Sequence, residues 1–232
     1  MIINTRPIDL GSKLNVLLQK YKCSFTHIPL TKVIKIQPSE KAKHYISHSS
    51  KYDLLIFTSQ SSVLYGAEYS KEILLKNNQA SILSIGLATQ KSLMQHSIAS
   101  SIPPTFDSEG LACVIKEKGY KKCLVFCGQK KPRILSLTDA DIDLFPCYSS
   151  LDESEINFMQ IKDENKLVIL IHTLQSLRVL IKELPNDSMQ KISLVVPSKR
   201  IKEFSIEQGF KECLLAESAH DQDMLDAALS LS

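Results

Sequence analysis

Hydroxyl side chains mark four points where an apolar run gives way to a helix-like stretch: Ser59, Thr89, Thr173 and Ser198. The runs before Ser59 and before Thr173 are alike, so the two halves of the chain repeat one pattern. A helix that starts where a strand ends directs free N–H groups and its positive dipole end at a ligand. The pattern therefore predicts an anion site. Plain helix N-capping, worth about 1 kcal/mol at each position, is the simpler alternative, and the two roles can coexist.

Basic residues near the same points could neutralise bound carboxylates. Arg6 is the strongest candidate because it directly follows the first apolar strand, and Arg133 and Lys199 are further candidates. Lys131 we interpret as a solvated surface charge. Several cations and N–H groups at helix starts would suit a ligand that carries many negative charges.

Two other patterns are too incomplete to indicate a cofactor. His44 and His48 are four residues apart, but Tyr45 replaces the glutamate of the H-E-x-x-H motif and no third ligand is evident. The segment 128–131 begins with glycine and ends with two lysines, yet it lacks the spacing of a phosphate-binding loop. We therefore assign no metal, no nucleotide and no other cofactor.

Composition is that of an ordinary globular protein. The 232 residues are 44% hydrophobic and 23% charged, and the net charge of +3 is too small to indicate nucleic-acid binding. No apolar stretch reaches the roughly 20 residues of a membrane span. The first residues resemble a strand, so we expect no signal peptide. The six scattered cysteines indicate reduced thiols. We expect a cytoplasmic monomer with no membrane partner.

Strands and helices are expected to alternate, which favours parallel sheets covered by helices on both faces. A leucine stripe at positions 10, 14, 17 and 18 marks the first helix. Further helices are expected from about Ser62, from a cap near Thr89, after Pro132, and near 175–184, 198–208 and 221–230. Gly209 is expected to end a helix and Asp221 to cap one. Strands are expected at 2–5, 54–58, 82–86, 123–127, 167–171, 192–196 and 212–216.

Two proline-containing β segments, 25–36 and 141–148, interrupt the alternation. Proline donates no ladder hydrogen bond, so each segment is expected at an edge, and together they would form a two-strand ribbon. The chain would leave a first domain, build a second, and return. We thus expect a discontinuous domain 1 (1–32 with 151–232), a ribbon linker (33–45 and 139–150) and domain 2 (46–138), with the ligand in a cleft between the domains.

The sequence resembles the uroporphyrinogen-III synthase family. No single motif is diagnostic, and it is their order and spacing together that carry the resemblance. The motifs that carry it are Thr5-Arg6-Pro7, Ile28-Pro29-Leu30, 53–63, 84–89, 125–128 followed by Lys131 and Arg133, Cys147-Tyr148, and 219–229. The resemblance implies two similar flavodoxin-like α/β domains joined by a β-ribbon.

The resemblance also implies a reaction. The substrate would be hydroxymethylbilane, a linear tetrapyrrole with eight carboxylates, which loses its terminal hydroxyl as water and gives an electrophilic azafulvene. Attack by the substituted position of the last pyrrole gives a spiro intermediate. That intermediate fragments and recloses with the last ring inverted, which yields uroporphyrinogen III in haem biosynthesis. The resemblance would make the protein a cyclising hydro-lyase, with the bilane as its small-molecule partner.

Tyr148 matches a tyrosine that the family places on the ribbon, and a phenol there can donate a hydrogen bond to the departing hydroxyl. Without the resemblance, a tyrosine that only packs on the ribbon would be favoured. The expected substrate-binding set is Arg6, Ser59, Gly86, Thr89, Gly128, Arg133, Thr173, Ser198 and Lys199.

The second half departs from the family pattern. Val196 stands where the family often has a glycine that lets the backbone approach a ligand, and His172 stands where an aromatic residue or threonine is usual. Lys199 would partly compensate by its charge. The alternative function is a non-catalytic two-domain anion-binding protein, or an inactive member of the same family. A phospho-receiver is disfavoured, because its central strand would end in aspartate.

Overall fold

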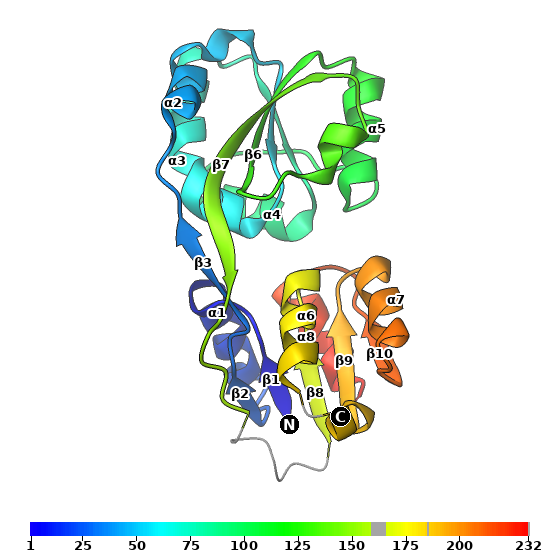
Figure 1. Ribbon diagram of the computed structural model, residues 1–232. Coiled ribbons are helices and arrows are strands. Elements are labelled where there is room, and N and C mark those ends of the chain that lie inside the picture. Colours follow the sequence, from blue (N-terminus) through cyan, green and yellow to red (C-terminus); the bar gives the residue numbers. More distant parts are fainter. Residues whose placement is uncertain (159–165, 185, 232) are drawn as a thin grey trace. The chain divides into compact units, whose positions relative to one another are not determined.

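The computed structural model describes residues 1–158, 166–184 and 186–231. These residues form two compact units, one of Met1–Lys32 with Leu151–Ser232 and the other of Val33–Ser150 (Figure 1). Each unit contains a five-stranded sheet, and every strand pair whose register is defined is parallel. The α/β fold class with parallel sheets is confirmed. Within the described residues, no helix has the length and apolar character needed to span a membrane.

The first unit has the strand order β10-β9-β8-β1-β2. Counted along the chain within this unit, the order is 2-1-3-4-5, which is that of flavodoxin. Its strands are β1 (Ile2–Asn4), β2 (Phe25–His27), β8 (Leu167–Leu170), β9 (Ile192–Val196) and β10 (Glu212–Leu215). Its helices are α1 (Ile8–Lys20), α6 (Leu174–Glu183), the 3₁₀ helix η4 (Asn186–Lys191), α7 (Lys199–Glu207) and α8 (Asp221–Leu229).

The second unit has the strand order β3-β7-β6-β4-β5. Its strands are β3 (Thr31–Lys35), which begins at the boundary between the units, β4 (Leu54–Phe57), β5 (Ser81–Ser84), β6 (Lys122–Gly128) and β7 (Asp141–Asp152). Its α-helices are α2 (Glu40–Ser47), α3 (Gln60–Lys76), α4 (Leu87–Gln95) and α5 (Ser108–Lys118). Two 3₁₀ helices, η1 (Ser49–Lys51) and η2 (Arg133–Ser136), complete it.

Both faces of each sheet are covered, and this explains why the central strands β4 and β8 are apolar throughout. In the first unit, Ile3 and Ile169 pack in a cluster with residues of α6 and α7. Their neighbours Ile2 and Val168 pack in a separate cluster with α1 and α8. The second unit repeats this division, with residues of α2, α3 and α4 in one cluster and α5 in the other. All six cysteines are free thiols.

The predicted ribbon is only partly right. β3 and β7 are neighbours, but β7 also pairs with β6, so it is an internal strand of the second sheet. The segments 33–45 and 139–150 thus lie inside the second unit, and 40–47 is helical. Pro146 was expected at an edge. It is tolerated inside the sheet because the pairing with β6 shifts register there, and bulges admit proline.

Several predicted helix ends also differ. α3 begins at Gln60 and α4 is capped by Gly86, so Thr89 is the third residue of its helix and not a cap. The segment after Pro132 forms only the short η2. His220 caps α8, and the predicted cap Asp221 is the first helical residue. Gly209 has the expected left-handed backbone, with φ of 98°.

Candidate functional site

Strand order defines one crevice in each unit. In a doubly wound sheet, ligands bind beyond the carboxyl ends of the strands, at the point where the strand order reverses. In the second unit that point lies between β4 and β6, and in the first between β1 and β8. The residues that follow these four strands are therefore the candidates that the fold itself selects.

Tyr148 and Ser59 meet at the reversal point of the second unit. They are 89 residues apart in sequence, and the Tyr148 hydroxyl lies 3.0 Å from Ser59 Oγ. The register shift aligns Tyr148 with Gly128 at the end of β6. A Cβ atom on Gly128 would lie only 3.0 Å from Cε2 and Cζ of the Tyr148 ring, so glycine allows the ring to approach the backbone. Ser59, Gly128 and Tyr148 thus form one site.

The N-terminus of α3 fixes the Ser59 hydroxyl. Ser59 Oγ accepts a hydrogen bond from the Ser62 N–H at 3.0 Å, and the Ser59 N–H donates to Ser62 Oγ at 3.1 Å. Either hydroxyl can be the donor in the Ser59–Tyr148 contact, and when Ser59 donates to the Tyr148 oxygen the phenolic proton is available to a ligand. Burial raises the pKa of Tyr148 and outweighs the opposing effect of Ser59, so the phenol is neutral at physiological pH.

The other predicted residues of the second unit lie around α4 and η2. Gly86 caps α4 and has no side chain that could accept from the first N–H groups of this helix, so the cap residue itself leaves these donors available. Thr89 is buried within α4. Arg133 lies in η2, where its guanidinium is 2.6 Å from the Glu109 carboxylate. A ligand carboxylate at Arg133 would therefore compete with this exposed ion pair.

In the first unit, Arg6 and Thr173 follow β1 and β8 at the reversal point. The Thr5 hydroxyl donates to the Leu170 carbonyl and ties the ends of these strands together. Arg6 is buried and pairs with Asp221 at the start of α8. The exposed Thr173 caps α6 by accepting from the Ser176 N–H at 3.0 Å.

Ser198 and Lys199 lie one strand further from the reversal point, after β9. Ser198 caps α7, accepting from the Ile201 N–H, and Lys199 is exposed in its first turn. Val196, where a family glycine was expected, is fully buried and accepts a backbone bond from Ala216. The turn after β9 therefore presents Ser198 and Lys199, while the backbone at Val196 belongs to the sheet.

A closed ring of hydrogen bonds, which sequence reasoning missed, holds the Arg6 backbone. Asn4 Oδ1 accepts from the Arg6 N–H, and Asn4 Nδ2 donates to Asn15 Oδ1. Asn15 Nδ2 then faces His27 Nδ1 at 3.0 Å, and His27 Nε2 faces the Arg6 carbonyl at 2.8 Å. A carbonyl only accepts, so His27 carries its proton on Nε2 and accepts at Nδ1. The feature of the sequence that could have indicated these hydrogen bonds is Asn4, a polar residue within an apolar strand.

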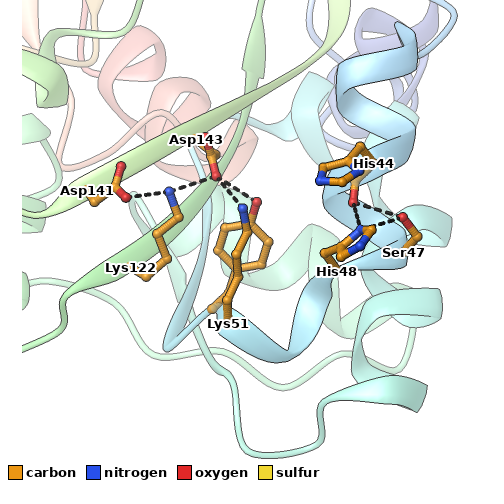
Figure 2. A network of polar contacts seen from close by, with 8 residues as sticks. His44, Ser47, His48, Lys51, Lys122, Asp141 and Asp143 are labelled. Atoms are coloured by element: carbon orange, nitrogen blue, oxygen red, sulfur yellow. Dashed lines mark hydrogen bonds and ion pairs between the residues drawn. The ribbon is translucent and has the colours of Figure 1, made fainter.

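A polar cluster of the second unit lies at the opposite end of the strands. Lys51 precedes β4, Lys122 begins β6, and Asp141 and Asp143 stand at the start of β7 (Figure 2). Because these strands run parallel, their starts are remote from the edge that carries Ser59 and Gly128. His44 and His48 stack on α2, and the described residues contain no group of three or more metal-ligand side chains. We interpret the lysine–aspartate cluster as stabilising the second sheet.

A pocket of about 240 Å³ in the first unit is not a suitable site for a polycarboxylate. Glu153 and Glu155 form part of its lining, together with His27 and Pro29. The Glu153 carboxylate lies 3.6 Å from Lys32 Nζ, whereas Glu155 makes no ion pair within the part of the chain that the structure describes, so the pocket would repel anions.

Comparison with known proteins agrees with the geometry. The family model for uroporphyrinogen-III synthase HemD matches residues 12–226. No curated protein matches the chain.

Two solved structures are similar over the whole chain. A mutant uroporphyrinogen III synthase from the extremely thermophilic bacterium Thermus thermophilus has 13% identity and a TM-score of 0.64, covering 100% of this chain and 99% of that one. Uroporphyrinogen-III synthetase from Helicobacter pylori has 14% identity and a TM-score of 0.62, with the same coverage. At such identities the structural likeness establishes the fold, and the family model spans nearly all residues. The chain belongs to the uroporphyrinogen-III synthase family.

Proposed function

We propose that this chain converts hydroxymethylbilane to uroporphyrinogen III, with loss of water and inversion of the last pyrrole ring, as a cyclising hydro-lyase of tetrapyrrole biosynthesis. The observation that carries the proposal is the Tyr148–Ser59 pair beside Gly128 in a member of this family. It offers a neutral hydrogen-bond donor at the point where the fold receives ligands.

Tyr148 assists the departure of the terminal hydroxyl. The carbon–oxygen bond breaks with its electron pair leaving on oxygen, while electrons of the pyrrole form the exocyclic double bond of the azafulvene. The pyrrole N–H loses its proton, and this proton and the departing hydroxide make up the water that is lost. A phenol that hydrogen-bonds this oxygen stabilises the charge that develops on it. Either hydroxyl of the Tyr148–Ser59 pair can be the donor, and we take Ser59 as the donor because this leaves the phenolic proton available to the substrate. The raised pKa of Tyr148, caused chiefly by burial, keeps the donor proton in place.

Helix starts and cations hold the eight carboxylates. The start of α4 offers uncapped N–H groups, and α3, α6 and α7 each retain donors beyond the one that their cap uses. Arg6, Arg133 and Lys199 contribute positive charge. Arg6 and Arg133 already pair with carboxylates of the protein, so a substrate carboxylate would replace an existing partner. The net gain in binding free energy is therefore smaller than it would be for an unpaired cation.

Distributed contacts of this kind are sufficient to direct the closure. The bilane closes without enzyme to the uninverted isomer, so the protein must favour one route. A hundredfold preference requires about 2.7 kcal/mol of differential barrier lowering. One or two charge-assisted hydrogen bonds, at roughly 1.5–3 kcal/mol each, supply this if they hold the bilane in one conformation.

The test is isomer analysis with enzymatically generated hydroxymethylbilane. The products are oxidised and the two isomers separated for the wild type, Tyr148→Phe and Ser59→Ala. The wild type should give mainly the inverted isomer. Tyr148→Phe should fold normally and turn over roughly ten- to a thousandfold more slowly, because it loses one proton donor. Ser59→Ala should show a smaller loss, because it removes the partner of the donor and not the donor itself.

The same assay separates the alternatives. A wild-type protein that yields only the uninverted isomer, at the uncatalysed rate, would be a non-catalytic anion binder or an inactive family member. Unchanged single-turnover rates for Tyr148→Phe would remove the chemical role of Tyr148 and leave it as a packing residue.

A further inference from the structure

His172 is a shielded imidazole close to the Leu170 backbone, and within the described residues its ring nitrogens make no hydrogen bond of ordinary geometry. Both ring nitrogens are hidden from solvent, and neither has a partner among the described residues. Leaving such a donor or acceptor unpaired in the folded protein is unfavourable, and native proteins rarely tolerate it without a reason. The only other shielded side-chain atom of this kind in the described structure is the hydroxyl of Ser49.

The position of His172 points to a ligand. It is the second residue after β8 and precedes Thr173, the cap of α6, so it lies at the strand-order reversal of the first unit. The buried guanidinium of Arg6, on the neighbouring strand end, is close enough to influence the charge state of His172. An unsatisfied polar ring, a buried cation and a helix start are thus gathered where this fold receives ligands.

The ring is uncharged in the free protein. Burial, and secondly the positive charge of Arg6, lower the pKa of His172 well below its ordinary value. A neutral imidazole has one N–H donor and one acceptor nitrogen. Hydroxymethylbilane carries the complementary groups, namely carboxylates that accept and pyrrole N–H groups that donate.

We propose that His172 is a substrate-binding residue whose imidazole pairs with a carboxylate or a pyrrole N–H of the bilane, next to Arg6. The inference rests on the proposed function. His172 is half-buried as a residue, so part of its side chain is already exposed, and the inferred contact requires the ring to turn its shielded nitrogens toward the substrate. A hydrogen bond to the substrate removes the cost of the unpaired ring nitrogens in the free protein. The imidazole is therefore satisfied only in the complex.

The competing interpretation is a histidine that only fills space. The two interpretations differ in what phenylalanine does at this position, because phenylalanine retains the ring and lacks the nitrogens. If the nitrogens serve the substrate, His172→Phe should melt at the same temperature as the wild type or a few degrees higher, since it removes unpaired polar atoms. Substrate affinity should fall in the same variant.

The experiment compares the wild type, His172→Phe and His172→Gln, with His44→Phe as a control on the exposed stack of α2. KM and kcat are measured with enzymatically generated bilane. Equilibrium binding is measured with uroporphyrin III, a stable macrocycle with eight carboxylates. His172→Phe should raise KM and the uroporphyrin Kd about five- to twentyfold with kcat nearly unchanged. Glutamine, which retains a donor and an acceptor, should restore most of the affinity, and His44→Phe should change neither constant.

Two results would overturn the inference: wild-type affinity in His172→Phe, or equal losses in the phenylalanine and glutamine variants. A wild-type protein that binds uroporphyrin and does not cyclise the bilane would instead refute the proposed function, and the binding comparison would still decide the role of His172.

Discussion

Replacing Asp143 by asparagine should destabilise the protein in a pH-dependent way. Its carboxylate, with the side chain only 16% exposed, accepts from Lys122 at 2.8 Å, from the Tyr52 hydroxyl at 2.9 Å and from Lys51 at 3.2 Å (Figure 2). Burial alone would raise the pKa of Asp143, but these hydrogen bonds outweigh it and hold the pKa at about 2, against an ordinary 3.8.

The size of the effect follows from that difference. A folded-state pKa this far below the ordinary value corresponds to about 2 kcal/mol of stability at neutral pH. Solvent screening around the partly exposed Lys51 reduces this, and the asparagine amide still accepts from Tyr52. We therefore expect Asp143→Asn to lower the free energy of unfolding by about 1–2 kcal/mol at pH 7.

The direction of the pH dependence is fixed by the lowered pKa. As pH falls below about 4, the unfolded carboxyl binds its proton first, so the advantage of the wild type shrinks and is lost as pH approaches 2. Urea unfolding followed by circular dichroism at pH 7, 5, 4 and 3 measures this convergence. The matched control is Asp141→Asn, whose 72% exposed side chain pairs with the same Lys122 and should contribute less than about 1 kcal/mol. Equal losses in both variants, or an Asp143→Asn deficit that persists undiminished at pH 3, would refute the reasoning.

Three further substitutions test the sites. Gly128→Ala should reduce turnover about tenfold or more with little loss of stability, because the added Cβ displaces the Tyr148 phenol. Steady-state kinetics measures this loss, and a wild-type kcat would contradict the prediction. Gly11→Ala should lower the free energy of unfolding, measured in urea, by about 1–3 kcal/mol, since its Cβ would lie 2.5 Å from the hydrogen-bonded His27 imidazole. Wild-type stability would mean that the imidazole is not held rigidly. Thr173→Ala should lower the free energy of unfolding by about 1 kcal/mol, because α6 loses its cap. If the Thr173 hydroxyl also binds a carboxylate, kcat/KM should fall about five- to a hundredfold, and an unchanged kcat/KM would leave capping as its only role.

The sequence by itself predicted what depends on neighbouring residues. Apolar runs such as Leu54–Phe57 and Leu167–Leu170 became strands, because a strand covered on both faces must be apolar throughout. Ser59, Thr173 and Ser198 became helix caps, because a cap is a contact across three residues of one segment. The glycine cap of α4 was missed because Thr89 offered the better local signal.

Only the tertiary structure decided which of these residues meet. Strand order aligns Tyr148 with Gly128 and brings it to Ser59, and it makes β7 an internal strand. The Arg6–Asp221 pair spans 215 residues, and no local pattern encodes a contact of that separation. The shielded ring of His172 is equally invisible in sequence, since the absence of a partner is a property of everything packed around it. Local chemistry fixes elements and caps, whereas strand pairing between distant segments determines which side chains can act on one ligand.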